Sequence, residues 1–194
     1  MPEKGGATMG KLTLIVGGKR SGKSDFAQSL AEEFGDSILY IATLVPEDDE
    51  EVKSRIEYRK TMRPVTWDTL EAYDGIAEHI TEFGAAYDGI VLDRISVLIT
   101  QLLGEHDAIW ESVPLSAVLE IEKSILQTVR KVVQAAKQAP APVVMITNEM
   151  GMGSRPVDRF NKIRRDITCR ANTKIAAQAD EVYVMMAGLP VKIK

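Results

Sequence analysis

Eight consecutive residues near the start of the chain have the types and spacing of a phosphate-binding loop. They complete the pattern G-x-x-x-x-G-K-[ST] and are Gly17, Gly18, Lys19, Arg20, Ser21, Gly22, Lys23 and Ser24. Glycines let successive backbone N–H groups face phosphate oxygens, and the amino end of a following helix adds partial positive charge. In such a loop the lysine reaches the β- and γ-phosphates, and the serine hydroxyl joins the shell of Mg²⁺. The sequence therefore predicts a site for a nucleoside triphosphate with Mg²⁺.

A carboxylate, Asp93, is the second candidate for chemistry. It ends the apolar run Gly89 to Leu92, which is typical of a buried strand. In P-loop folds a carboxylate at such a strand end holds Mg²⁺, often through water, or activates a nucleophile. Asp93 is also placed to cap a following helix, and this alternative stays open. Motors, switches, kinases and nucleotidyltransferases all use the loop, so the loop alone does not name the reaction.

Alternating strand and helix patterns are expected to position these residues. Apolar runs predict strands at 12–16, 37–42, 65–70, 89–92, 142–147, 181–186 and 190–194, and helical spacing predicts helices at 23–34, 46–62, 73–83, 115–137 and 156–179. This order indicates an α/β fold with a mainly parallel sheet, helices on both faces and a short C-terminal strand pair. Ligands of such sheets bind at the carboxyl ends of the strands.

Composition limits the number of domains and the classes of partner. The 194 residues fit one domain, which we expect at 11–194, with 1–10 a disordered extension that contains an alternative start at Met9. The net charge of −4 disfavours binding to nucleic acid or to an anionic membrane. The single cysteine, Cys169, excludes an intramolecular disulfide and favours a buried, inert thiol in a reducing cytoplasm. No apolar run reaches the ~20 residues needed to span a bilayer.

Further motifs follow the loop in a fixed order along the chain. They are Leu39-Tyr40-Ile41-Ala42-Thr43, Arg55-Ile56, Arg63-Pro64, Trp67-x-Thr69-x-Glu71, Thr147-Asn148-Glu149-Met150-Gly151-Met152-Gly153, Phe160 with Arg165-Asp166, Asn172, Ala179-Asp180-Glu181-Val182 and Gly188 with Lys192. Together with the loop, this series resembles adenosylcobinamide kinase/adenosylcobinamide-phosphate guanylyltransferase, a cobalamin-biosynthesis family. The likeness covers nearly the whole chain from Lys11.

The resemblance implies two activities and a set of nucleotide contacts. It implies that ATP or GTP phosphorylates the aminopropanol hydroxyl of adenosylcobinamide, and that GMP from GTP is then joined to adenosylcobinamide phosphate. It also implies a RecA-like fold and a homotrimer. The residues that match the family's nucleotide contacts are the loop, Ala42, Thr43, Leu44, Lys60, Thr61, Met62, Arg63, Glu71 and Asp93. Within this scheme Lys23 and Asp93 are catalytic, Ser24 and Asp93 hold Mg²⁺, and Arg63 neutralises phosphate charge.

One position departs from the family pattern. The family's guanylyl group is first taken by a histidine four residues after the arginine of the Arg-Ile pair, and this chain has Arg59 there. A guanidinium stays protonated and is not expected to act as the nucleophile. The histidines, His79 and His106, are expected in exposed or helix-capping roles, and Tyr58 or Lys60 would need a lowered pKa to substitute. An enzyme with the kinase activity alone is therefore an alternative.

Other marked residues keep two interpretations each. Glu149 either orients water or Mg²⁺ or binds backbone N–H groups of its own loop. Arginines near the last long helix, such as Arg165, meet phosphates or form a solvated face, and Trp67 and Trp110 pack against a ligand ring or fill the core. Two other classes of protein are alternatives to the enzyme: a non-catalytic GTP-binding regulator, and a DNA-dependent motor, which the acidic balance disfavours.

Overall fold

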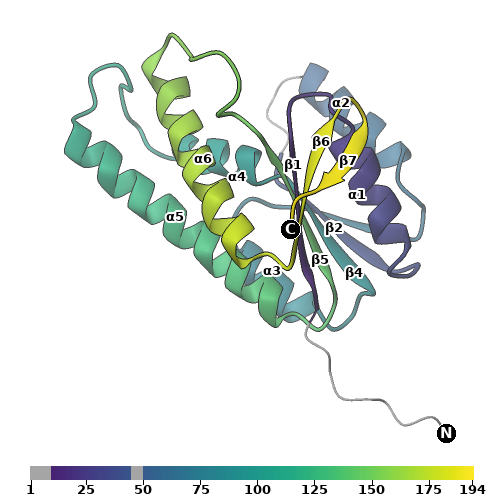
Figure 1. The fold of residues 1–194 in the computed structure, drawn as a ribbon. Coiled ribbons are helices and arrows are strands. Elements are labelled where there is room, and N and C mark those ends of the chain that lie inside the picture. Colours follow the sequence, from purple (N-terminus) through teal and green to yellow (C-terminus); the bar gives the residue numbers. More distant parts are fainter. Residues whose placement is uncertain (1–9, 45–49) are drawn as a thin grey trace, which may run out of the picture.

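The computed structural model describes residues 10–44 and 50–194, without the side chains of Glu51, Val52, Arg55, Ile56 and Arg59. The expected N-terminal extension lies outside this part, apart from Gly10. Within the described residues the chain forms one seven-stranded sheet in the order β3-β2-β4-β5-β1-β6-β7, flanked by helices (Figure 1). The strands are β1 Leu12–Gly17, β2 Ile38–Ala42, β3 Asp68–Glu71, β4 Gly89–Asp93, β5 Val143–Asn148, β6 Glu181–Met186 and β7 Leu189–Lys192.

Strand pairing aligns the carboxyl ends that carry the site. All neighbouring strands are parallel except β6 and β7, which form an antiparallel pair. Strand β5 lies between β1 and β4, in agreement with the expected RecA-like arrangement, so the loop strand and the Asp93 strand are not neighbours. The register places Gly17 beside Asn148, and Ala42 beside both Asp93 and Glu71. The ends of five strands therefore meet along one edge.

Helices cover both faces because alternate strand residues point to opposite sides. Leu14 lies in a core cluster with residues of α3 to α6, whereas Ile15 lies in a second cluster with Ala27 and Ala31 of α1. Figure 1 shows α1 on one side and the long helices α5 and α6 side by side on the other, both ending near the same end of the sheet. The helices are α1 Lys23–Glu32, α2 Glu50–Thr61, α3 Ile76–Phe83, α4 Ile95–Gly104, α5 Leu115–Gln138 and α6 Arg159–Gln178. No helix of the described segments is both long and apolar enough to cross a bilayer.

Three elements begin three residues later than the sequence prediction, and most other ends shift by one or two residues. The strand expected from Val65 begins at Asp68, because a turn closed by the Trp67 N–H and the Pro64 carbonyl at 3.1 Å leaves Val65 fully exposed. Helix α3 begins only after Gly75, whose φ of 62° is left-handed. Helix α6 begins after Asp158, whose carboxylate accepts from the N–H of Asn161 as an N-cap. The first residues of the helix expected at 46–62 lie outside the described residues.

Helix α4 is not predicted by the hydrophobic periodicity of the sequence. Its sequence is apolar around most of its circumference, and Ile95, Leu98, Ile99 and Leu103 are all fully buried. It contacts α5, α6 and β5, so little of its surface faces water. A helix buried on several sides lacks the polar stripe that makes helical periodicity visible.

Glu181, the first residue of β6, makes the stability of the fold depend on pH. Its carboxylate, 14% exposed, pairs with Lys11 at 2.6 Å and with Lys192, and these contacts lower its pKa from 4.5 to about 2. A lowered folded-state pKa stabilises the fold above the unfolded pKa, and this contribution is lost as pH falls from about 4.5 towards 2. Because both lysines are about half exposed, we expect Glu181→Gln to lower the free energy of unfolding near pH 7 by only ~1 kcal/mol.

Urea unfolding at pH 7 and pH 3 measures this effect. Wild type should lose more stability than Glu181→Gln between the two values, while Glu120→Gln, at an exposed position of α5, should follow wild type. Identical pH slopes for wild type and Glu181→Gln would show that the ion pairs contribute nothing.

Candidate active site

The phosphate-binding loop connects β1 to α1 and is closed by tight backbone contacts. The N–H of Ser21 donates to the Gly18 carbonyl at 3.3 Å, and Gly22 has a left-handed φ of 85°. A Cβ on Gly17 would lie 2.9 Å from the Met185 carbonyl oxygen, and one on Gly22 would lie 3.3 Å from Gly188 Cα. The first and last motif glycines are therefore needed for conformation and for packing against the β6–β7 hairpin.

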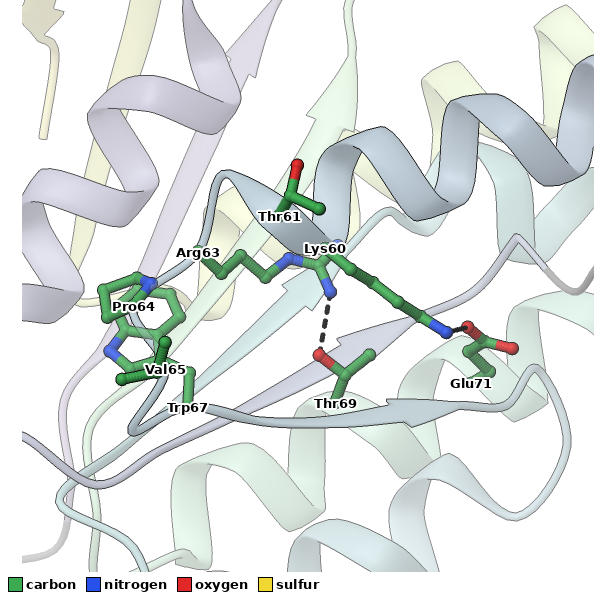
Figure 2. A pocket seen from close by; sticks show the side chains of 8 residues that line it. All are labelled: Lys60, Thr61, Arg63, Pro64, Val65, Trp67, Thr69 and Glu71. Atoms are coloured by element: carbon green, nitrogen blue, oxygen red, sulfur yellow. Dashed lines mark hydrogen bonds and ion pairs between the residues drawn. The ribbon is translucent and has the colours of Figure 1, made fainter.

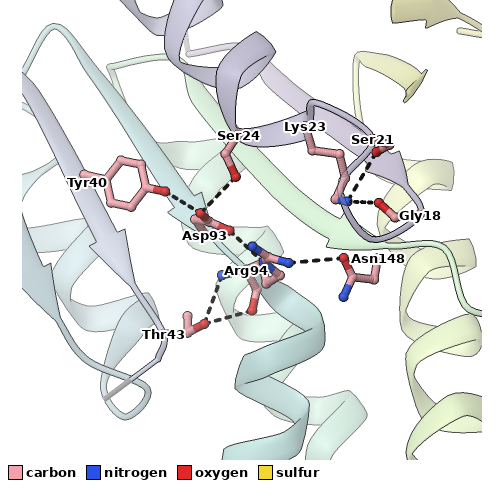
Figure 3. A network of polar contacts seen from close by, with 9 residues as sticks. All are labelled: Gly18, Ser21, Lys23, Ser24, Tyr40, Thr43, Asp93, Arg94 and Asn148. Atoms are coloured by element: carbon pink, nitrogen blue, oxygen red, sulfur yellow. Dashed lines mark hydrogen bonds and ion pairs between the residues drawn. The ribbon is translucent and has the colours of Figure 1, made fainter. Parts of the chain in front are cut away.

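Lys23 brings its ammonium group back over this loop. Its side chain is largely buried, with 4% of the residue exposed, and Nζ donates to the Gly18 carbonyl at 2.6 Å and to Ser21 Oγ at 3.4 Å (Figure 3). The cation is thus held against the anion-binding side of the loop from the first turn of α1. This is the placement that the motif predicts for the lysine that contacts terminal phosphates.

Asp93 receives donors from three different elements. Its Oδ2 accepts from Ser24 Oγ at 3.4 Å and from the hydroxyl of Tyr40, and its Oδ1 accepts from Arg94 Nε at 2.9 Å (Figure 3). The N-cap of α4 is Arg94, and no side chain caps that helix end, so the capping interpretation of Asp93 was wrong. The peptide bond between Asp93 and Arg94 is cis.

The oxygens of Ser24 and Asp93 fit the preferences of Mg²⁺. Both are hard donors, and they lie on one side of the loop at 3.4 Å from each other. Among the described residues, no group of three or more His, Cys, Asp or Glu side chains is arranged to hold a metal. Mg²⁺ usually binds proteins through one or two side chains plus substrate phosphates and water, so this sparse donor set is the expected one.

A second polar cluster lies between α2 and β3. It forms a pocket of about 600 Å³ whose lining residues, shown in Figure 2, are Lys60, Thr61, Arg63, Pro64, Val65, Trp67, Thr69 and Glu71. Lys60 Nζ pairs with Glu71 Oε1 at 2.6 Å, and Arg63 donates to Thr69 Oγ1 at 2.9 Å. The hydrogen bonds to Glu71 and Glu57 raise the pKa of Lys60. Lys60 is therefore a cation at this site. A nucleophilic lysine would need a lowered pKa, and the pKa of Lys60 is raised.

One buried ring connects the two clusters. The guanidinium carbon of Arg63 lies 3.6 Å from the centroid of the Tyr40 ring, which also stacks against Trp67 at 6.4 Å between centroids. The hydroxyl of the same tyrosine donates to Asp93. Tyr40 thus contacts residues of the pocket through its ring and the Asp93 carboxylate through its oxygen. Contacts from Arg63 to Tyr40, from Tyr40 to Asp93 and from Asp93 to Ser24 therefore connect the pocket to the loop.

The remaining predicted contacts have mixed placements. Thr43 is fully buried, and its hydroxyl binds the N–H and carbonyl of Arg94, both at 2.9 Å. Ala42 is buried and its carbonyl accepts from the N–H of Ala72, while Leu44 is half-buried. Met62 is 60% exposed outside the pocket lining. Arg59 belongs to α2, but its side chain lies outside the described residues.

Several other marked residues have structural contacts. Glu149 Oε1 accepts from the N–H of Gly151 at 2.5 Å, as the backbone-binding interpretation predicted, and Arg165 donates to the carbonyl of Gly151. Trp110 packs on Phe160. Burial raises the pKa of the half-buried Cys169 thiol, in line with an unreactive cysteine.

Both histidines are half-buried. His79, half-buried, stacks on Phe83 at 6.0 Å between ring centroids, and its Nδ1 is buried without a hydrogen-bond partner among the described residues. His106 follows α4 and is also half-buried. The expected exposed or capping role was therefore wrong for His79, whose ring packs on Phe83 of the same helix.

Sequence reasoning missed the contacts that Tyr40 and Arg94 make with Asp93. Tyr40 is the single polar side chain of the apolar run Ile38 to Ala42, and a buried hydroxyl needs a partner. Arg94 is a cation placed directly after the strand-end carboxylate. Both signals were visible, but only the pairing of β2 with β4 shows that Tyr40 and Asp93 meet.

Comparisons with known proteins agree with this geometry. The family model described as cobinamide kinase / cobinamide phosphate guanyltransferase matches residues 13–193. The chain is 39% identical over 190 residues to the bifunctional adenosylcobalamin biosynthesis protein CobU of Salmonella typhimurium, covering 94% of this chain and 99% of that protein. It is 36% identical to CobU of Escherichia coli over 190 residues with the same coverage.

A more distant relative is the bifunctional adenosylcobalamin biosynthesis protein CobP of Pseudomonas aeruginosa, which is 29% identical over 181 residues, covering 93% of this chain and 96% of that protein. The family match includes the phosphate-binding loop, Asp93 and the pocket beside α2, and it extends nearly from end to end. This chain therefore belongs to the cobinamide kinase / cobinamide phosphate guanyltransferase family.

Proposed function

We propose that this chain phosphorylates the aminopropanol hydroxyl of adenosylcobinamide with ATP or GTP, and then transfers GMP from GTP to the resulting phosphate. The observation that carries the proposal is the joining of the Lys23 loop, the Ser24–Asp93 pair and the cationic pocket through Tyr40. Family membership supplies the substrate class, since the curated relatives are named as bifunctional enzymes of adenosylcobalamin biosynthesis.

In the kinase step the substrate hydroxyl oxygen forms a bond to the γ-phosphorus, and the bond between that phosphorus and the β–γ bridging oxygen breaks. Lys23 and the loop N–H groups stabilise the charge that develops on the phosphoryl oxygens. Ser24 and Asp93 would hold Mg²⁺, which when bound neutralises part of the triphosphate charge. Asp93 is also the carboxylate available to accept the hydroxyl proton.

In the guanylyl step a phosphate oxygen attacks the α-phosphorus of GTP, and pyrophosphate leaves. Arg63 and the protonated Lys60 give the pocket two cations for these phosphates. Glu71 holds the side chain of Lys60 in place, and Thr69 holds that of Arg63. Neither an enzyme with kinase activity alone nor a non-catalytic regulator is favoured by the relatives, which are named as bifunctional enzymes.

The finer assignments belong to this proposal. We assign nucleotide contacts to the loop, to Lys60, Thr61, Arg63 and Glu71, and to Asp93. Residues 11–194 act as the catalytic domain with Mg²⁺ as cofactor, in the cytoplasm. A homotrimer is proposed from the family resemblance alone.

Product analysis tests the function directly. The protein is incubated with adenosylcobinamide and ATP or GTP, and phosphorylated and GDP-linked corrinoids are separated by chromatography and mass spectrometry. We expect phosphate transfer with at least one triphosphate and the GDP-linked product with GTP. Failure to modify the corrinoid with either triphosphate, by protein that binds both, would refute the proposal.

The replacement of the family's histidine by Arg59 leads to a specific prediction about the guanylyl step. With GTP labelled at the α-phosphate, we expect no label to remain on the denatured protein while GDP-linked product accumulates. The guanidinium stays protonated, and the pKa of neighbouring Lys60 is raised, so neither is a nucleophile and GMP passes directly between substrates. Retention of label, mapped by peptide mass spectrometry to one residue, would instead identify a substitute nucleophile.

A further inference from the structure

Arg94 places a further cation beside Asp93, and the reaction steps proposed above give this residue no role. Its side chain is only 15% exposed, and Nε donates to Asp93 Oδ1 at 2.9 Å while NH1 donates to Asn148 Oδ1 at 3.3 Å. The guanidinium therefore bridges the carboxyl ends of β4 and β5. Figure 3 shows it between Asp93 on one side and the phosphate-binding loop with Asn148 on the other.

Both anchors of this guanidinium are tied to the phosphate-binding loop. Asp93 contacts Ser24, which follows Lys23 in the first turn of α1. Asn148 pairs in register with Gly17, and the N–H of the next residue, Glu149, donates to the Gly17 carbonyl at 2.9 Å. Arg94 thus lies between contacts to the first and the last residue of the loop. A terminal phosphate held by the loop would be directed towards this part of the sheet edge.

The backbone of Arg94 is fixed, so the position of the cation is set before any ligand binds. The Thr43 hydroxyl contacts both its N–H and its carbonyl at 2.9 Å. The carbonyl also accepts from the N–H groups of Val97 and Leu98, at 3.1 and 3.0 Å. A group held in this way stabilises developing charge without reorganising during the reaction.

The guanidinium also has unused donors. It carries five N–H groups, and among the described residues only Asp93 and Asn148 accept from it, one bond each. Three N–H groups thus remain for a ligand, in the planar geometry that suits phosphate oxygens. A purely structural ion pair would not need the second anchor beside the loop.

We propose that Arg94 is a catalytic residue that contacts the γ-phosphoryl group of the bound triphosphate and stabilises it during transfer. The assignment has two halves: recognition of the γ-phosphate, and its stabilisation during transfer. The second half rests on the proposed kinase activity, because the acceptor is the corrinoid. The first half, recognition of the γ-phosphate, concerns the nucleotide alone and is measurable without the corrinoid.

Calorimetric titration of Arg94→Gln with ADP and with the β,γ-imido analogue of ATP tests the first half. Wild type should prefer the triphosphate analogue, and the variant should lose about tenfold of that preference while its affinity for ADP stays within about twofold. Repeating the titration with EDTA removes any contribution of Mg²⁺. Arg170→Gln, which breaks the pair between Arg170 of α6 and Glu122 of α5, is the matched control and should behave as wild type.

Steady-state kinetics tests the second half. We expect kcat for corrinoid phosphorylation to fall about 10²-fold in Arg94→Gln, with a smaller fall in Arg94→Lys, which keeps the charge but loses the planar fork. Arg94→Lys also provides the test if the glutamine variant does not fold. Equal weakening of ADP and analogue binding would show that Arg94 only supports the fold, and an unchanged kcat and triphosphate preference would overturn the assignment. A wild type that discriminates the γ-phosphate through Arg94 but leaves the corrinoid unmodified would refute the proposed function and keep the γ-phosphate contact.

Discussion

Lys23→Ala is expected to lower kcat for corrinoid phosphorylation by about 10³-fold, the largest effect of any single substitution considered. The ammonium group is 2.6 Å from the Gly18 carbonyl and is held on the inner side of the loop by a side chain that is almost fully buried. Alanine removes the charge without replacing it, because the other two cations of the loop, Lys19 and Arg20, are exposed, whereas Lys23 is buried. Single-turnover assays with saturating ATP and adenosylcobinamide measure the loss in the chemical step.

A lysine outside the site provides the control for this variant. Lys137 lies in the last turn of α5, where Nζ donates to the Gln178 carbonyl and pairs with Asp180 at 3.7 Å. Lys137→Ala should keep kcat within about twofold of wild type, because its charge lies outside the site. If Lys23→Ala retained a tenth or more of the wild-type rate, the loop would not be the seat of phosphoryl transfer.

Asp93→Asn is expected to lower kcat by about 10²-fold and to raise the Mg²⁺ concentration needed for half-maximal rate. The amide keeps the size of the carboxylate, but it removes the negative charge that faces Arg94 and turns one acceptor into a donor. Of the three groups that now donate to Asp93, at least one then loses its acceptor. We also expect ~2 kcal/mol of destabilisation, because an inward-facing arginine loses its anion.

The control for Asp93→Asn is another aspartate that binds a tyrosine. Asp68 is exposed on β3, and its Oδ2 accepts from the Tyr87 hydroxyl at 2.9 Å. Asp68→Asn should leave the Mg²⁺ titration unchanged. A Mg²⁺ dependence in Asp93→Asn equal to that of wild type would show that this carboxylate does not hold the metal.

The sequence was sufficient for the loop and for most of the sheet. Gly17 to Ser24 form the predicted strand–loop–helix, because glycine spacing and β-branched runs act locally. Each of the seven predicted strands is present, with ends shifted by a few residues. The exception at Val65 arises where Pro64 starts a turn, so an apolar side chain was mistaken for the beginning of β3.

The connections within the site were less accessible from the sequence. Tyr40, Arg63 and Asp93 come from segments more than twenty residues apart, and their contact depends on β2 lying between β3 and β4. Hydrophobic periodicity reports which face of an element is buried, but it does not report strand order. For the same reason the capping role considered for Asp93 was a reasonable local interpretation, and only the tertiary partners of the carboxylate exclude it.

The place of β1 in the sheet has a consequence for synthesis on the ribosome. This strand is made before all the other strands of the sheet, yet its two neighbours are β5 and β6, which lie more than a hundred residues later in the sequence. Gly22 then packs against Gly188, in the turn between β6 and β7. A nascent chain therefore cannot complete its triphosphate site until β6 and Gly188 have been made, and fragments that stop before β6 should be unable to bind nucleotide.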